Sequence, residues 1–196
     1  MSPAHVLEPT FQRLKRMLLE GAWPPGEKLE ALRIADEFSV SMTPVRDSLN
    51  LLAGARLVDL KPGEGYRVAQ ISEQGLRDML DLNAAILDQC FPFKAPGKPP
   101  LKSRLVDRNY ADRVCALFDM VAARAGNAIL SETVRSLSER MHVVRNHESR
   151  IFPDALQELK DLERLAAAED LGIRSRIRAY HEQRRDAASA LIQLLY

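Results

Sequence analysis

Cysteine is scarce in this 196-residue chain, and the only two, Cys90 and Cys115, lie in separate segments. A disulfide scaffold is therefore not expected, and each cysteine is interpreted as a small apolar thiol in a reducing compartment. The sequence also lacks a run of about 18 apolar residues and a charged-then-apolar signal at its amino terminus. These absences predict a cytoplasmic protein without a membrane span.

Excess charge of either sign is missing as well. The formal net charge is +1, and the stretch through Gln70 contains nine basic and nine acidic residues. Non-specific affinity for DNA comes mostly from attraction to phosphates, so a DNA-binding domain of this composition would depend on the placement of single charges and on dimerisation. The hydrophobic content of 46% is that of an ordinary globular protein.

The segment 30–68 predicts two short helices followed by a β-hairpin. A polar break at 39–41 ends the first helix before Thr43, which is expected to cap the second, and Pro44 follows at the first helical position. Apolar residues at helical spacing mark the first helix. They are Leu29, Leu32, Ile34, Ala35 and Phe38.

The second helix has an apolar stripe on one face and leaves Arg46, Asp47 and Asn50 off that stripe. Further along, the alternation of apolar and polar residues predicts strands at 57–60 and 66–68, joined by a turn. Two helices followed by such a hairpin predict a winged helix-turn-helix, whose second helix can enter the major groove of DNA.

Residues 7–70 resemble the amino-terminal domain of GntR-family bacterial transcription regulators. The resemblance rests on LKRMLLEGAWPPG, VSMTPVRDSL and LVDLKPGEGYRV. Three DNA-facing arginines of the family fall on Leu32, Met42 and Arg46, so two of them are replaced by side chains without charge or hydrogen-bond donors. An intramolecularly paired or solvated charge is the alternative for Arg46. The DNA contacts that the resemblance implies are Arg33, Ser41, Thr43, Arg46, Gly65 and Arg67.

After Gln70 the sequence predicts helices only, separated by a proline-rich breaker at 91–100. The predicted fold class is therefore mostly α, with a winged helix-turn-helix at 1–70 and an all-α antiparallel helical bundle at 71–196. The helices are expected at 72–90, 103–124, 128–146, 153–168 and 171–195.

The second half is similar to the ligand-sensing FCD domain of the FadR-type branch of the same family. The motifs are LFDMVAARAGNAIL and ELKDLERLAAAED, followed by AYHEQ. The domain looks shortened, because the breaker replaces a helix that usually precedes the first motif. The metal-ligand positions of metal-binding members fall on Val114, Phe118, Leu159 and His181. Three of the four are apolar, so no metal or other cofactor is expected.

The resemblance implies a homodimeric repressor that binds a palindromic operator in double-stranded DNA and responds to a small-molecule effector. Its pocket has become apolar, which favours a less charged or larger apolar effector, unless side chains simply fill the space. Asn83, Phe118, Leu159 and His181 are the pocket candidates, whereas His142 and His147 are expected to be solvated or capping.

Two other classes of function are alternatives to this interpretation. A degenerate regulator that acts as a protein-interaction module is favoured by the missing arginines and opposed by the intact Ser41, Thr43 and Arg46. An enzyme is not predicted, because neither Asp112 with Asp119 nor Cys115 with His181 has the spacing of a known catalytic constellation.

The depleted ligand set gives a first prediction, that the protein holds no structural or effector-binding metal. Metal analysis of untagged protein purified without chelator should find far less than one ion per chain, and a chelator should leave the melting temperature unchanged. A stoichiometric ion retained through dialysis would contradict the alignment and point to Asp112, Asp119, His142 or His147 as unpredicted ligands.

Overall fold

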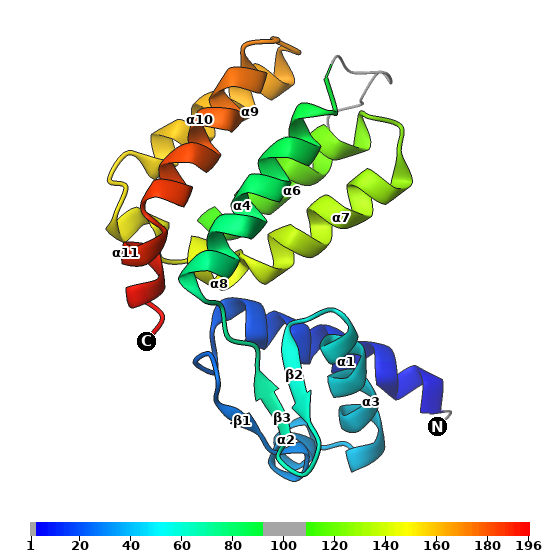
Figure 1. Ribbon diagram of the computed structural model, residues 1–196. Helices are drawn as coiled ribbons and strands as arrows, with labels where there is room; N and C mark the ends of the chain where they lie inside the picture. Colours follow the sequence, from blue (N-terminus) through cyan, green and yellow to red (C-terminus); the bar gives the residue numbers. More distant parts are fainter. Residues whose placement is uncertain (1–2, 92–108) are drawn as a thin grey trace. The chain divides into compact units, whose positions relative to one another are not determined.

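The computed structural model describes residues 3–91 and 109–196, and the chain forms two compact units (Figure 1). The first contains Met1–Ile71 with Leu195–Tyr196, and the second contains Ser72–Leu194. The described residues are mostly helical and include one small antiparallel sheet, which confirms the predicted fold class.

The first unit is a helix-turn-helix with a three-stranded sheet of order β1-β3-β2. The predicted hairpin is confirmed, with Leu60 opposite Tyr66 in its register. The structure adds a short strand that the sequence analysis missed, in which Leu29 pairs with Tyr66. The elements are α1 (Pro3–Glu20), β1 (Lys28–Leu29), α2 (Ala31–Phe38), α3 (Met42–Gly54), β2 (Val58–Lys61) and β3 (Gly65–Val68).

Two details of the predicted helices were wrong. Leu29 lies in a strand rather than in the first helix, because Glu30 is extended and α2 begins only after it; Leu32 is then 61% exposed. Ser41, not Thr43, is the N-cap residue of α3, which makes Pro44 the third helical residue. Proline is still tolerated there, because the amides of the first turn have no partner within the helix.

The core of the first unit is built from the inward faces of α1, α2 and α3 and from the sheet. Ser39, with a φ of 56°, makes the left-handed turn that sends α3 back across α2. The buried side chains are Leu14, Leu18, Leu29, Ile34, Ala35, Phe38, Val45, Leu49, Leu52, Leu57, Val58 and Val68.

The second unit is an all-helical bundle in which α4 packs against α10, α11, α7 and α6. The predicted helix 128–146 breaks at Met141, and the predicted helix 171–195 breaks at Ala187. Residues 92–108, which contain most of the breaker and the expected helix start at Ser103, lie outside the described residues. The elements are α4 (Glu73–Asp88), α6 (Tyr110–Ala123), α7 (Ala128–Arg140), α8 (His142–Arg145), η1 (Glu148–Arg150), α9 (Ala155–Ala167), α10 (Ile173–Asp186) and α11 (Ala188–Gln193).

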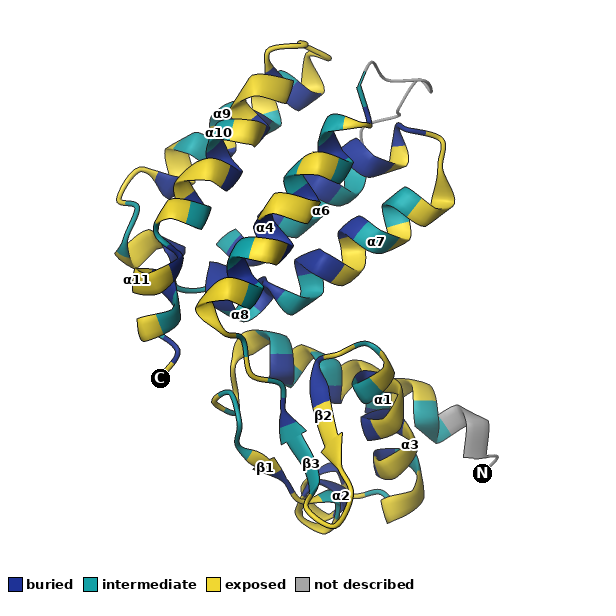
Figure 2. Cartoon of the chain, viewed as in Figure 1, coloured by how far each residue is buried: buried dark blue, intermediate teal, exposed yellow. Residues whose placement is uncertain are grey.

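Side-chain caps define where several of these helices begin. The Ser72 hydroxyl accepts a hydrogen bond from the Gly75 amide, as its predicted capping role requires. Asn109 and Asn127 cap α6 and α7 in the same way. Figure 2 shows that buried residues line the inward sides of the helices and exposed residues the outward sides.

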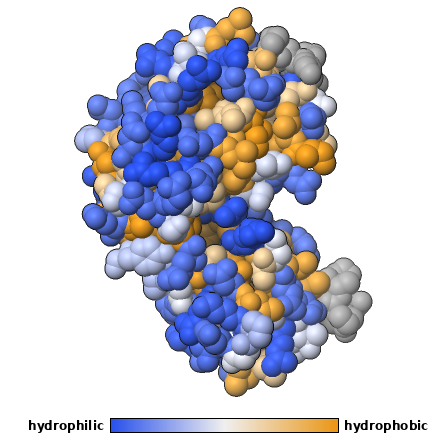
Figure 3. Space-filling model, viewed as in Figure 1, coloured by the Kyte–Doolittle hydropathy of each residue, from blue (hydrophilic) through white to orange (hydrophobic). Residues whose placement is uncertain are grey.

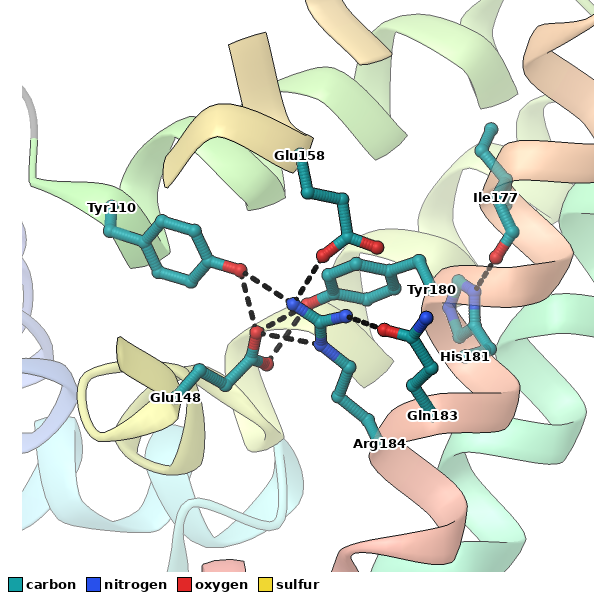
Figure 4. Close-up of polar contacts among 8 residues, drawn as sticks. All are labelled: Tyr110, Glu148, Glu158, Ile177, Tyr180, His181, Gln183 and Arg184. Carbon is teal, nitrogen blue, oxygen red and sulfur yellow. Dashed lines mark hydrogen bonds and ion pairs between the residues drawn. The ribbon is translucent and has the colours of Figure 1, made fainter. Parts of the chain in front are cut away.

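A buried ion pair between Glu148 and Arg184 joins four elements of the bundle (Figure 4). The Glu148 carboxylate is 2% exposed and accepts hydrogen bonds from the Arg184 Nε at 3.0 Å, the Tyr110 hydroxyl at 2.6 Å and the Tyr180 hydroxyl at 2.9 Å. Arg184 also pairs with Glu158 at 2.6 Å. These contacts connect η1 to α6, α9 and α10.

Aromatic rings of Tyr180 and Phe152 cover the Arg184 guanidinium of this ion pair and exclude water from it. The Arg184 guanidinium lies 3.9 Å from the Tyr180 ring centroid and 4.4 Å from that of Phe152. Burial, reinforced by the Glu148 carboxylate, raises the pKa of both Tyr110 and Tyr180 above the ordinary range. Both hydroxyls therefore remain protonated and able to donate.

Removing the carboxylate should be costly, because a buried guanidinium and two hydroxyls would lose their main acceptor. We expect Glu148→Ala to lower the free energy of unfolding by about 3–5 kcal/mol. Urea denaturation would measure this. The control is Asp161→Ala, which removes a carboxylate from an exposed pair with Arg164 and should cost no more than about 0.5 kcal/mol. Equal losses in both variants would contradict the structural role of Glu148.

Candidate functional site

The outward face of α3 carries the residues that the sequence analysis assigned to DNA. Val45, Leu49 and Leu52 are fully buried beneath it, which fixes how the helix is rotated. Thr43 and Arg46 are exposed as a result. The predicted division of this helix into a buried stripe and a free face is confirmed, and the free face is the one that could enter a groove.

Hydrogen-bonding groups at the start of α3 remain available. Ser41 is exposed and its side chain makes no capping hydrogen bond, and the Thr43 hydroxyl has no hydrogen-bond partner among the described residues. Arg46 has no ion-pair partner within 4 Å in the same part of the chain. Two hydroxyls and one guanidinium can thus meet phosphates or base edges without first breaking a contact within the protein.

Arg33 occupies a different environment on α2. It lines a surface hollow of about 220 Å³ together with three carboxylates, those of Glu27, Glu30 and Glu37. Glu37 is one helical turn beyond Arg33, and Glu30 is the extended N-cap residue of the same helix. Lys28 also lines the hollow and pairs with Glu30 at 3.8 Å, so Arg33 lies on a surface of mixed charge.

The two basic residues of the wing are partly neutralised by one carboxylate. Glu64 lies 3.6 Å from the Arg67 Nε and 4.0 Å from the Lys61 Nζ. Arg67 also donates to the Gly26 carbonyl at 3.1 Å. Arg67 therefore helps to hold the wing against the chain that enters β1, which is the intramolecular alternative for a surface arginine.

Gly65 allows the backbone of the wing to adopt a left-handed conformation. Its φ of +85° lies in the left-handed region that favours glycine, and an added Cβ would meet nothing within 4 Å. Conformation rather than packing is thus what requires glycine here. The open space beside it would also allow close approach of a DNA backbone.

The wing and α3 are linked by a contact that the sequence analysis missed. The Tyr66 hydroxyl donates to the Asn50 side-chain oxygen at 2.7 Å, so a strand residue is tied to the free face of the helix. Alternation identified Tyr66 as a strand residue, but nothing in the sequence indicated its partner 16 positions earlier.

Leu32 and Met42, the positions at which the resemblance led us to expect arginine, are both on the surface. They are 61% and 39% exposed. Met42 is the first residue of α3 and is not a core residue, so the alignment that placed it outside the core is consistent with its position.

The four predicted pocket residues of the second unit are all buried, with exposures of 0% to 2%. The Asn83 amide donates to the His181 Nε2 at 3.1 Å, and the ring of His181 lies 5.1 Å from that of Phe118. Phe118 and Leu159 belong to the same core cluster. The residues therefore pack as part of the core, as the space-filling alternative requires.

The state of His181 follows from its two ring nitrogens. Its Nδ1 lies 2.7 Å from the Ile177 carbonyl and must carry the proton, which leaves Nε2 as the acceptor for Asn83. Burial lowers the pKa of His181 to about 3, against the raising effect of the hydrogen bond to Ile177 and with a smaller contribution from the cations Arg145 and Arg184. His181 is therefore a neutral core residue at physiological pH.

Arg145 is a second buried cation, and sequence reasoning missed it. It is 1% exposed and lies 5.3 Å from the Phe118 ring centroid. Its Nη1 contacts the Cys115 sulfur at 3.2 Å, while its Nη2 is buried without a hydrogen-bond partner among the described residues. A cavity of about 10 Å³ lies beside it and is also lined by Glu148 and Arg184.

One expectation about histidine was wrong. His142 is 3% exposed and bonds through Nε2 to the Asp112 carboxylate at 3.0 Å, so it is not solvated. Among residues 3–91 and 109–196, no three His, Cys, Asp or Glu side chains are grouped as metal ligands, and the absence of a metal stays a prediction. No helix in those ranges is long and apolar enough to cross a membrane.

A sequence signal for the buried arginine of α10 did exist. Ile173, Ile177 and Tyr180 form an apolar stripe at helical spacing, and Arg184 continues it one turn later. A charged residue inside such a stripe has to be buried and therefore needs a partner. The identity of that partner, Glu148, depends on long-range packing.

The comparison with known families and proteins agrees with the geometry of the first unit. Residues 8–68 match the family described as bacterial regulatory proteins, gntR family. The HTH-type transcriptional repressor GlaR of Escherichia coli (strain K12) is 35% identical over 74 residues, which are 38% of this chain and 34% of that protein. The uncharacterised HTH-type transcriptional regulator BphR of Paraburkholderia xenovorans (strain LB400) is 31% identical over 41% of this chain and 33% of its own length. Each match thus spans about a third of the relative.

Solved structures resemble the chain over nearly its whole length. A transcriptional regulator GntR from Rhodococcus sp. RHA1 has a TM-score of 0.73 at 16% identity and covers 95% of this chain and 97% of its own. McbR/YncC of E. coli has a TM-score of 0.64 at 18% identity, with coverage of 97% and 98%. At these identities the likeness establishes the fold. The named relatives are transcription regulators and not enzymes.

The exposed position of Arg46 predicts a direct role in binding. Arg46→Ala should weaken binding to an operator duplex, obtained by selection from a random DNA pool, by about 1–3 kcal/mol and leave the melting temperature unchanged. Fluorescence anisotropy with labelled duplex would measure the affinity. Arg164→Ala, which removes an exposed cation from the second unit, is the matched control and should bind as the wild type does. Unchanged affinity of Arg46→Ala would remove this residue from the interface.

The buried neutral His181 predicts a pH dependence of stability. Its folded pKa of about 3 lies below the usual 6.5, so between these values the unfolded chain binds a proton that the folded chain does not. Stability should therefore fall as the pH drops below 6.5, by up to about 1.4 kcal/mol per pH unit. Urea denaturation at pH 7.5 and pH 5.0 should show a smaller loss in His181→Gln than in the wild type. An equal loss in both proteins would contradict this assignment.

Proposed function

We propose that this chain, whose residues 8–68 match the gntR family, is a bacterial transcriptional regulator that binds a palindromic operator in double-stranded DNA. The observation that carries the proposal is the free face of α3, where Ser41, Thr43 and Arg46 are exposed without partners among the described residues. The adjoining wing, positioned by Arg67 and Tyr66, could follow the DNA backbone. Such a role would place the protein in the cytoplasm.

The functional form in this proposal is a homodimer. The amino-terminal segment has no excess positive charge, so one copy would gain little from phosphate attraction. Two linked copies on two half-sites double the contacts without new chemistry. Figure 3 shows hydrophobic residues gathered over the region of α4 and α7 in the second unit. Leu82 of α4 and Ile129 of α7 are 49% and 68% exposed, which supports a dimer surface there.

The second unit is proposed to be an FCD-like effector domain of the FadR type. The cavity beside Arg145 has apolar walls, which favour an effector with an apolar body, and none of the four predicted pocket residues lines it. These walls are Leu76, Leu80, Met141, Val144 and Leu191. The unpartnered Arg145 Nη2 offers one donor for the polar end of the effector. The cavity of about 10 Å³ has room for about one water molecule, so an effector must separate the helices to enter.

The need to separate the helices suggests how effector binding could alter DNA binding. An effector that holds the bundle open would stabilise a conformation other than the closed one, and the two DNA-binding units of a dimer would change their spacing with it. We propose repression as the sign of regulation, in line with the name of the relative GlaR. The alternative role, a protein-interaction module without DNA binding, is not favoured by relatives that are named as regulators.

Selection of bound duplexes from a random DNA pool tests the proposal directly. We expect a palindromic consensus, and sedimentation analysis should find two chains per duplex. As a control, the same random pool is selected with the Arg46→Ala variant, which should enrich the consensus only weakly. Failure of the wild-type protein to enrich any sequence would overturn the proposal and favour the interaction module.

A further inference from the structure

Met42 is an apolar side chain at the exposed start of α3. It is 39% exposed, and it lies between the N-cap Ser41 and the exposed Thr43. The packing of α3 does not require it, because the buried side of that helix is formed by Val45, Leu49 and Leu52. The exposed part of its side chain is therefore available to a partner outside the chain.

The helix geometry places Met42 next to Arg46. Residues four positions apart are neighbours on one side of an α-helix, so the thioether and the guanidinium are one turn apart on the same flank of the free face. An arginine in a major groove commonly pairs with the O6 and N7 atoms of guanine. An apolar side chain one turn away would then face an adjacent base pair.

The major groove offers one apolar group at base level, the C5-methyl of thymine. Every other atom of the base edges in that groove is a hydrogen-bond donor or acceptor or a ring carbon beside one, and a thioether satisfies them poorly. Methionine is unbranched and polarizable, so it can adjust to a methyl group without a fixed geometry. The side chain and the methyl group would both be removed from water.

We propose that Met42 is a specificity-determining residue that contacts the C5-methyl group of a thymine in each half-site, next to the base pair contacted by Arg46. This inference rests on the proposed function, because it assumes that α3 enters the major groove. It specifies that one operator position should be thymine, which the exposure and charge of the residues on α3 do not determine.

The test uses the full-length protein and the duplex obtained by selection. Thymines of the half-site are replaced one at a time by deoxyuridine, which removes only the methyl group. At one position we expect the affinity to fall about fourfold per half-site, equivalent to ~0.8 kcal/mol for one buried methyl-sized group. Replacing that position with cytosine and with 5-methylcytosine gives a second comparison, in which the methylated base should bind more tightly.

Variants then assign the methyl contact to Met42. In Met42→Ala the affinity for the thymine duplex should fall, and the difference between thymine and deoxyuridine should disappear. Leu51→Ala is the matched control, because Leu51 is a 53% exposed apolar residue about half a turn around the same helix. It should keep the full difference. Met42→Arg should bind DNA more tightly and steepen the salt dependence by about one unit of slope.

The outcomes separate this inference from the proposed function. A selected consensus whose binding is insensitive to every deoxyuridine substitution overturns the methyl contact and leaves the regulator intact. Equal loss of affinity on both duplexes in Met42→Ala also overturns it, since Met42 would then act without the methyl group. Enrichment of no sequence at all overturns the proposed function and this inference together.

Discussion

The second unit depends on a carboxylate that has been taken out of water. Glu148 is stable in the interior only because Arg184, Tyr110 and Tyr180 donate to it, and these donors come from helices far apart in the sequence. A buried pair of this kind contributes little net stability, because desolvation offsets most of the attraction, but any arrangement that separates its members is heavily penalised. The pair therefore specifies which packing of α6, α9 and α10 the bundle adopts.

The same constraint bears on any movement of the bundle. The cavity beside Arg145 is bordered by Glu148 and Arg184, so a ligand that enlarges it has to act next to the ion pair. Arg145 is itself buried with one unpartnered nitrogen, which is a cost that an incoming acceptor could relieve. The cavity thus adjoins both the buried ion pair and a buried donor that has no partner among the described residues.

Local patterns predicted most of the fold, and long-range contacts account for what they missed. Helical spacing located the stripe of Val45, Leu49 and Leu52, and alternation located the hairpin. Strand β1 was missed because two residues carry no periodicity, and only pairing with β3 makes Leu29 a strand residue. The contacts of Glu148 span 32 to 38 positions in sequence, so no local pattern could reveal them.

In the candidate DNA interface too, some features follow from the local sequence and others depend on residues far apart in the chain. The exposure of Arg46 followed from the stripe beneath it, whereas the engagement of Arg67 with Gly26 depends on residues 41 positions apart. That engagement also changes what the wing can contribute, because Glu64 offsets the charge of Arg67 and Lys61. A face with one unpaired arginine and an apolar neighbour gains little from phosphate attraction. In a DNA complex of the proposed kind, discrimination between sequences would come from base contacts, which depend on position rather than on total charge.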